Sequence, residues 1–490
     1  MKMWSGRFRQ PLDPAFERWQ RSFDFDRRLL RYELAASSAH ARALKNAGVL
    51  SADELISILQ GLEEIGVARA PSPANSVHEQ SPSVEHSPQP EDNEAEDVHH
   101  FVEKQLVALI GETGYKLHTG RSRNEQIATD LRLYVRATVD QLRHDLAELC
   151  GALADRAEQS GDQSGDAAMP AYTHLQKAEP VLIAHWLLAY VEMFLRDADR
   201  LADCRKRLNL CPLGSGAVAG ATLALDRAFM AEALGFDAPT ANSLDATSDR
   251  DFAIEFVNAL SLLAMHLSRW AEEMILFSSQ EYGFLTLPEA YSTGSSAMPQ
   301  KKNPDLLELV RAKAGRILGD ATALTVALKG LPLAYNKDLQ ETQQPLFAAS
   351  DTVVRMLPLV TGFMKSVEFN RARMQQAAHS GFTNAWAAAQ YLVNHGVPSR
   401  LAHERVGKAV QLCLEKNCEL QDLPLADLQS LSPAFGPDFY ESLKLASVLA
   451  IHDVTGGTAP NRVRQAVRDV RSKIESLREE VHTQETHAHA

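Results

Sequence analysis

Cysteine is scarce in this chain, and its cysteines are not arranged for a shared task. None of them forms a Cys-x-x-Cys pair and their number is odd; they are Cys150, Cys204, Cys211, Cys413 and Cys418. Neither a disulfide framework nor a cysteine zinc site is therefore predicted. No His-Glu-x-x-His segment for zinc occurs either. We expect a protein of the reducing cytoplasm that uses no metal and no cofactor.

Long apolar segments are missing too. Residues 1–9 lack the apolar run of a secretion signal, and no stretch of about 20 residues is apolar throughout, as a transmembrane helix requires. The formal net charge of −13 argues against a nucleic-acid surface, although it leaves room for a local anion pocket. We therefore expect no membrane span and no nucleic-acid partner.

The dominant pattern of the sequence is helical spacing of its apolar residues. Within 252–280, for example, Val257, Leu260, Ala264 and Leu267 recur at steps of three and four. Similar runs cover 127–160, 179–210, 304–330, 345–367 and 383–416. Because strand-like alternation is hard to find, we predict an all-α fold, a bundle of long antiparallel helices.

One of these runs is apolar around much of its girth. It contains Leu187, Leu188, Tyr190, Val191 and Phe194. A helix of this kind usually packs against more than one neighbour. We therefore expect a homo-oligomer.

Residues 71–97 interrupt the helical pattern. They hold five prolines and five serines, and acidic residues crowd their end. Such a stretch buries too little apolar surface to offset its ordering entropy, so we predict a mobile surface loop. A tolerated insertion is the plainer interpretation, and a phosphorylated or partner-binding tether is the alternative.

The most informative segment is 293–308, where small residues precede two lysines and a helix start. Asn303 suits the N-cap and Pro304 the first helical position. Lys301 and Lys302 then lie just before free backbone N–H groups, which makes a receptor for a carboxylate or phosphate. The lysines alone would fit an ordinary basic loop. Glycine and serine immediately upstream indicate a loop able to close over the anion.

Three further segments carry polar residues in suggestive places. Residues 116–126 place Arg121 and Arg123 around one serine before a long helix, which suits carboxylate binding but also a solvated turn. Thr173 and His174 precede a helix expected to begin near Glu179, and there histidine would serve proton transfer or orientation, or only structure. A polar cluster at 330–341 caps helices or faces a cavity.

Taken together, these segments resemble the fumarase/aspartase superfamily. Its signature, Gly-Ser-Ser-x-Met-Pro-x-Lys-x-Asn, matches residues 294–303 throughout. The runs Gly-Arg-Ser-Arg-Asn, Tyr-Thr-His-Leu-Gln, Pro-Leu-Gly-Ser-Gly-Ala, Ser-Asp-Arg-Asp and Leu-Ala-Tyr-Asn-Lys-Asp-Leu-Gln-Glu are similar to those of the argininosuccinate lyases. The likeness extends from Trp-Ser-Gly-Arg-Phe at 4–8 to 456–460, interrupted mainly by 71–97.

The resemblance implies a fold, an assembly and a reaction. It implies three helical domains, which we place at 1–120, 121–367 and 368–490. It also implies a homotetramer with a twenty-helix core, in which each active site is assembled from three subunits. The implied reaction is the reversible elimination of arginine from argininosuccinate to give fumarate, the last step of arginine biosynthesis.

The resemblance further implies roles for individual residues. Ser295 would be the general base, and His174, paired with Glu308 and helped by Thr173, would serve on the acid side. Lys301 and Asn303 would hold the carboxylate that accumulates charge. Substrate contacts are implied for Ser22, Arg123, Asn124, Thr173, Arg250, Asn303, Tyr335, Gln340 and Gln343.

The chemistry itself explains why cations and a closing loop are needed. Removing a proton next to a carboxylate creates a dianionic aci-carboxylate, which cations at a helix N-terminus stabilise with little reorganisation. A serine hydroxyl is a poor base, so its pKa must be lowered by backbone N–H groups and Lys301 in a closed, drier site. We hypothesise that loop closure activates the base.

Two positions depart from the family pattern and two rival functions stay open. Glu125 replaces the usual aspartate after Arg-Asn, and Gln343 stands where a lysine is common, so substrate affinity or choice is in doubt there. The rivals are another fumarate-releasing carbon–nitrogen lyase and a structural, crystallin-like relative. The presence of Ser295, His174 and Lys301 argues against the structural role.

Overall fold

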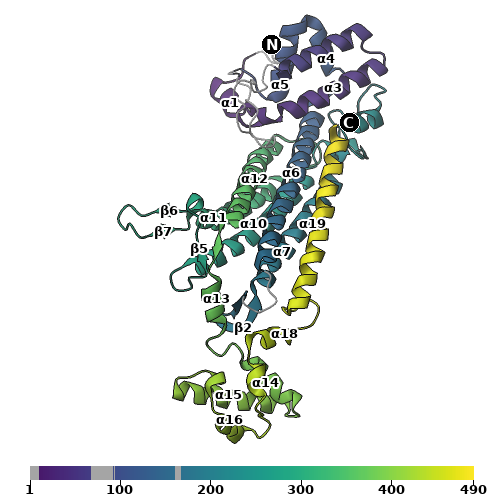
Figure 1. Ribbon diagram of the computed structural model, residues 1–490. Coiled ribbons are helices and arrows are strands. Elements are labelled where there is room, and N and C mark those ends of the chain that lie inside the picture. Colours follow the sequence, from purple (N-terminus) through teal and green to yellow (C-terminus); the bar gives the residue numbers. More distant parts are fainter. Residues whose placement is uncertain (1–9, 68–91, 93, 161–166, 490) are drawn as a thin grey trace.

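The computed structural model describes residues 10–67, 92, 94–160 and 167–489, and its main body is a bundle of long helices (Figure 1). Its members are α6 (Arg123–Ser160), α7 (Ile183–Leu208), α10 (Asp251–Ser278), α11 (Asp305–Leu328), α12 (Gln343–Ser366) and α19 (Pro460–His489). The prediction of an all-α bundle is confirmed, and five of the six predicted helical runs correspond to single helices.

The central helix of the bundle is α6, and its length sets the scale of the molecule. At 1.5 Å per residue its 38 residues extend about 57 Å. Its first half is buried on nearly every side, and α7 and α12 pack along the helix. Along its second half it is joined to α19, where Arg143 pairs with Glu480 and Arg478 with Glu148.

Shorter helices cover the end of the bundle where α6 begins (Figure 1). They are α1 (Pro14–Trp19), α2 (Phe23–Asp26), η2 (Arg27–Leu29), α3 (Leu30–Asn46), α4 (Ala52–Val67), α5 (Val98–Ile110) and η4 (Gly111–His118), with α8 (Arg227–Ala233) and α9 (Ser243–Ala246) beside them. Their apolar residues are continuous with the core of the bundle.

A small unit with its own core lies at the opposite end (Figure 1). After α13 (Arg371–Ala378) it contains α14 (Ala385–Asn394), α15 (Ser399–Lys416), η7 (Leu420–Asp422), α16 (Leu425–Leu431) and α17 (Phe439–Ser442), and α18 (Leu445–Ala450) leads back to the bundle. The run predicted over 383–416 is thus two helices. Gly396 with a positive φ and Pro398 end the first of them.

Strands are few, and two hairpins among them matter for the site. β1 (Ala168–Thr173) pairs with β2 (Gln176–Leu182), and β6 (Thr293–Gly294) pairs with β7 (Lys302–Asn303). The remaining short elements are β3 (Leu210–Cys211), β4 (Ala238–Pro239), β5 (Leu285–Thr286), β8 (Glu368–Phe369), η5 (Glu289–Tyr291) and η6 (Lys337–Thr342).

The structure corrects two local predictions. Residues 179–182 belong to β2 and the helix begins only at Ile183, because Pro180 and the pairing of 180–182 with 168–170 hold the chain extended. The five residues of α7 on which this expectation depends are buried inside the protomer: Leu187, Leu188, Tyr190, Val191 and Phe194. They therefore give no reason to expect an oligomer.

The predicted mobile loop at 71–97 lies mostly outside the described residues. Its end was wrongly included: Ala95 is fully buried, and Asp97 caps α5 by accepting the N–H of His100 at 2.7 Å. Asp92 and Asp97 accept backbone N–H groups and so stabilise the chain there, which the acidic composition alone did not indicate. Residues 4–8, which contributed to the family likeness, also lie outside the described residues.

One helical stretch, Lys337–Ser366, is long and apolar enough to cross a membrane by composition alone. More than half of its apolar window, 56%, is buried inside the protein. A core helix of a bundle passes the same test, because it is apolar toward several neighbours.

Candidate active site

The signature segment forms a hairpin that stands out from the side of the bundle (Figure 1). Ser295 lies where the loop leaves β6, and its Oγ accepts the backbone N–H groups of Ala297 at 3.2 Å and Met298 at 3.1 Å. Two N–H dipoles aimed at one oxygen favour negative charge on it. Lys301 and Glu308 are exposed nearby, on the returning arm and on α11.

Asn303 does not cap α11 as predicted. It belongs to β7, where its side-chain amide donates to the carbonyl of Gly294 at 3.4 Å, and Pro304 takes the cap position. The reason is that pairing with Thr293 commits the backbone of Asn303 to the hairpin. The Thr293 hydroxyl donates to the Asp305 carboxylate, which ties the hairpin to the first turn of α11.

His174 lies at the exposed tip of the β1–β2 hairpin. His174 and Leu175 have φ of 54° and 57°, so both central residues of this tight turn are left-handed without being glycine. Such residues are strained and are held only by their surroundings. Tyr172 anchors the hairpin by packing edge-on against Tyr282 at 5.5 Å between ring centroids.

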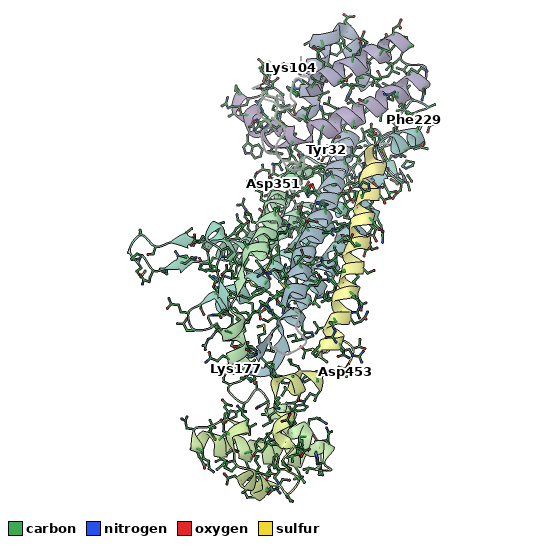
Figure 2. The ribbon with its side chains drawn as sticks, viewed as in Figure 1. Tyr32, Lys104, Lys177, Phe229, Asp351 and Asp453 are labelled. Atoms are coloured by element: carbon green, nitrogen blue, oxygen red, sulfur yellow. The ribbon has the colours of Figure 1, made fainter. Side chains whose placement is uncertain are left out.

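Lys177 holds the same hairpin from the other strand (Figure 2). Its ammonium donates to the carbonyl of Ala377 at 3.0 Å and to the carbonyl and hydroxyl of Ser380 at 3.3 and 3.0 Å. Partial desolvation, followed by the charge of Arg373, lowers the pKa of this largely exposed lysine. The tip that carries Thr173 and His174 is thereby fastened to the chain entering the small end unit.

A second group of predicted residues gathers at the other end of the bundle. Arg123, the first residue of α6, donates to Asp97 at 3.0 Å, and Ser22 donates to Asp26 at 2.6 Å. Burial, followed by the Asp97 charge, raises the pKa of Asp26 to about 7. Asn124 donates to the carbonyl of Ala217 at 3.3 Å.

Arg250 and Tyr335 belong to the same end. Arg250 is fully buried, and burial lowers its pKa to about 10 although Tyr335 and Asp249 act in the opposite direction. Burial also raises the pKa of Tyr335 against the influence of Arg250. The Nε of Arg250 has no hydrogen-bond partner among the described residues. A guanidinium left partly unpaired in this way suits an anionic ligand.

The two departures from the family pattern are both buried here. Glu125 accepts the N–H groups of Ser122 and Gly216, each at 2.9 Å, so the carboxylate fastens the 214–216 loop beside Asn124. Gln343 is 4% exposed, and its Oε1 has no donor among the described residues. Gln340, three residues earlier, donates to the carbonyl of Gln20 at 3.1 Å.

Within one chain the structure does not bring the predicted residues together. They form three groups, at the start of α6, on the 294–303 hairpin, and at the β1–β2 tip near the end of α6 (Figure 1). The first and last groups are separated by most of the length of α6, about 57 Å at 1.5 Å per residue. A single protomer therefore cannot place His174 beside Arg123.

Several residues that hold these groups were not predicted from the sequence. Asp97 was assigned to a loose acidic run, although an aspartate just before an apolar helical segment is an N-cap signal. Lys177 gave no local signal, because its partners lie far away along the chain, and neither did the contact of Asp26 with the N–H of Val98, 72 residues away.

Comparison with known proteins defines the class first. A family model described as lyase matches residues 6–319. The solved EDDS lyase in complex with formate is similar over 98% of this chain and 93% of its own, with a TM-score of 0.81 and 25% identity. Class II fumarase from Schistosoma mansoni covers 85% of the chain with a TM-score of 0.69 at 17% identity. The fold is that of the fumarase/aspartase superfamily lyases, and residues 294–303 carry the signature sequence of that superfamily.

The family follows from closer relatives. A model described as argininosuccinate lyase C-terminal matches residues 382–450. The argininosuccinate lyase of Koribacter versatilis is 59% identical over 482 residues, 98% of this chain and 99% of that protein. That of Acidobacterium capsulatum is 59% identical over 477 residues, 97% and 96% of the two chains. The chain belongs to the argininosuccinate lyase family.

Proposed function

We propose that the protein cleaves argininosuccinate to arginine and fumarate, reversibly and without a cofactor. The observation that carries the proposal is the 59% identity with argininosuccinate lyases over nearly the whole chain. The separate match of the 382–450 unit supports it, since the likeness is not limited to the part that matches the general lyase model.

The test is incubation with argininosuccinate while fumarate absorbance is followed in the ultraviolet. Aspartate, malate and adenylosuccinate serve as rival substrates in the same assay. Fumarate from argininosuccinate alone supports the proposal. Release from one of the others would instead favour a different fumarate-releasing lyase, and no release from any would favour a structural role.

We propose the following division of labour in the reaction. Ser295, as its alkoxide, takes the Cβ proton of the succinyl group, and Lys301 with Asn303 stabilises the aci-carboxylate that forms. The carbon–nitrogen bond then breaks, and its electron pair passes to the guanidino nitrogen of arginine. That nitrogen takes a proton from the acid side, to which we assign His174 with Glu308 and Thr173.

The remaining residues would bind the two ends of the substrate. Arg123 and Arg250 suit its carboxylates, because guanidinium groups bind carboxylates in a forked geometry. Smaller polar side chains would complete the contacts, namely Ser22, Asn124, Tyr335, Gln340 and Gln343.

We propose a homotetramer whose sites draw on three subunits. Three exposed apolar residues of α11 support this: Leu309, Leu318 and Val326 are 56%, 59% and 62% exposed. Leu262 on α10 is also exposed, and a groove of about 570 Å³ runs between α11 and α12. Large apolar side chains left exposed along the central helices of a bundle are typical of a protein interface.

Mixing inactive variants tests this arrangement. Ser295→Ala and His174→Asn subunits are each expected to be inactive, but random mixing in tetramers leaves about one site in four with both native residues if these come from different subunits. Recovery of activity on mixing supports shared sites. No recovery, despite mixed tetramers confirmed by native mass spectrometry, would contradict it.

We also propose a cytoplasmic location and domain boundaries at 120/121 and 367/368.

A further inference from the structure

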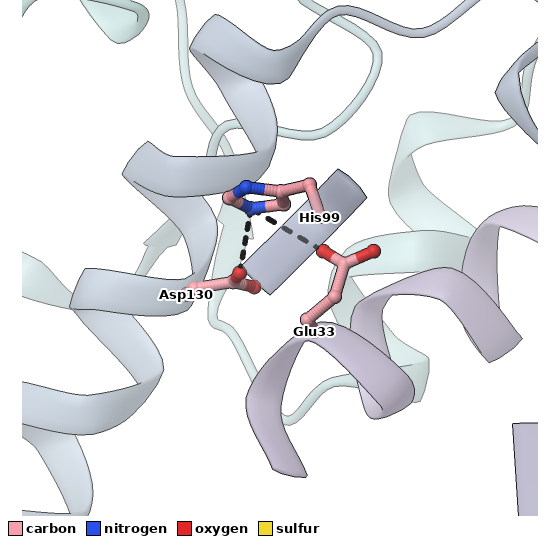
Figure 3. Close-up of side chains that lie close together, drawn as sticks. All are labelled: Glu33, His99 and Asp130. Atoms are coloured by element: carbon pink, nitrogen blue, oxygen red, sulfur yellow. Dashed lines mark hydrogen bonds and ion pairs between the residues drawn. The ribbon is translucent and has the colours of Figure 1, made fainter. Parts of the chain in front are cut away.

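Behind the group at the start of α6 lies a fully buried cluster of three titratable side chains (Figure 3). Glu33 comes from α3, His99 from α5 and Asp130 from α6, and they are 1%, 6% and 0% exposed. The Nε2 of His99 is 3.0 Å from Asp130 Oδ2 and 3.5 Å from Glu33 Oε2. None of the three has a place in the proposed reaction.

The surroundings of the cluster favour a protonated histidine at its centre. Burial by itself would lower the pKa of His99, but the carboxylates of Glu33, Asp97 and Asp130 outweigh it and raise the pKa to about 9. The other charged or titratable groups facing the cluster are Arg121, His118, Asp26 and Glu103.

A metal ion fits the same cluster less well. It would require the unprotonated imidazole, and Arg121 already lies 3.8 Å from Glu33 as a competing cation. Ser37 at 2.6 Å and Gln126 at 3.0 Å donate to the Glu33 carboxylate. The adjoining cavity measures about 10 Å³, which holds at most one water molecule.

The position of His99 connects the cluster to the proposed binding residues. Two residues before it, Asp97 caps α5 and accepts Arg123 at 3.0 Å. One residue before it, the N–H of Val98 donates to Asp26 at 3.0 Å, and Asp26 in turn accepts Ser22. The first turn of α5 is thus fastened on one side to Arg123 and Ser22 and on the other, through His99, to α3 and α6.

We propose that His99 is a positioning residue: as a cation between Glu33 and Asp130 it fixes the first turn of α5, so that Asp97 and Asp26 hold Arg123 and Ser22 toward the substrate. This inference rests on the proposed function, which assigns substrate contacts to Arg123 and Ser22. It predicts that His99 acts on substrate binding more than on the chemical step.

The test compares two buried histidine variants of the full-length protein. His99→Gln is expected to raise KM for argininosuccinate about tenfold or more, the size of one charge-assisted hydrogen bond, with kcat changed less than about threefold. His266→Gln is the matched control, because His266 is 7% exposed and its Nδ1 lies 2.7 Å from the buried Asp197, away from the site. The control should lose stability and keep its KM.

The pH profile adds a readout that a purely structural role would not change. The wild-type KM should rise as pH passes about 9, and this rise should be absent in His99→Gln. Should His99→Gln fail to fold, the double variant His99→Gln/Asp130→Asn removes the unpaired carboxylate and should still show the raised KM. An unchanged KM, or an equal change in the His266→Gln control, would overturn the proposal.

Two further measurements separate this inference from its alternatives. Hydrogen exchange of the amides of residues 97–102 should be faster in His99→Gln without any substrate, so it tests the anchoring even if argininosuccinate is not cleaved. Stoichiometric Zn²⁺ retained after dialysis by the wild type and lost in His99→Gln would overturn the proposal in favour of a metal site.

Discussion

Lys177 offers a sharp test of how the His174 hairpin is held. Replacing it by methionine keeps the length and apolar stem of the side chain but removes the ammonium and its three hydrogen bonds to Ala377 and Ser380. The substitution leaves His174 and Leu175 in place, and the native turn still requires a positive φ at both residues. The turn therefore loses its support while its strain persists.

The two opposing free energies are of similar size. Two left-handed residues that are not glycine cost about 2–4 kcal/mol together, at 1–2 kcal/mol each. Hydrogen bonds from a charged group contribute about 1.5–3 kcal/mol when buried, and Lys177 is exposed, so the lower end applies. Losing about 1.4 kcal/mol reduces the population of the native turn about tenfold relative to its alternatives.

The expected result for Lys177→Met is a kcat lowered about tenfold, with a smaller change in KM, because His174 serves the chemical step. Hydrogen exchange of the 171–178 amides should accelerate in parallel. The kcat and the exchange rate of Lys177→Arg should lie between those of the wild type and Lys177→Met, since arginine keeps the charge. Lys365→Met is the control, because that lysine is exposed and its ion pair with Glu148 is long, at 3.9 Å. Unchanged kcat together with unchanged exchange would refute the clamp.

Three other predictions concern the base, the unusual glutamine and alkaline pH. Ser295→Ala should lower kcat about 10²- to 10⁴-fold at an unchanged unfolding temperature. The control Ser292→Ala, outside the loop, should keep its kcat. Normal turnover of Ser295→Ala would contradict its assignment as the base. Gln343→Lys should lower KM, because the new ammonium lies close to a substrate carboxylate. It should also lower the unfolding temperature, because the ammonium is buried without a described partner. No change in either quantity would place Gln343 outside the site. The raised pKa of His99 means that its protonation stabilises the fold fully below pH 6.5 and that this contribution is lost as pH rises through about 9. Urea unfolding should therefore show a steeper alkaline loss of stability for the wild type than for His99→Gln, and equal slopes would contradict it.

The helical architecture was predictable because its cause is local and repeated. Apolar residues at steps of three and four define each long helix independently of its partners, and the runs at 127–160, 252–280, 304–330 and 345–367 match α6, α10, α11 and α12 within a few residues. The errors arose where a long-range pairing overrides local preference. Residues 180–182 form part of a strand because residues 168–170 pair with them.

The composition of the site was likewise readable from motifs, but its geometry was not. Ser295, Lys301 and Asn303 lie within one short segment, so the sequence already places them together. Nothing local in the sequence reveals that Asp97 holds Arg123 or that Lys177 holds the hairpin of His174, because these contacts join helices and strands far apart in the chain.

The amino-acid sequence by itself determined the helices, the signature loop and the family, since each depends on residues close together in the chain. The tertiary structure alone decided that the three groups of site residues lie at separate places along a bundle built on the 38 residues of α6. It also decided that His99 is buried between two carboxylates, behind the group of site residues at the start of α6. The physical reason is that burial and charge pairing depend on which helices meet, and only the packed bundle determines that.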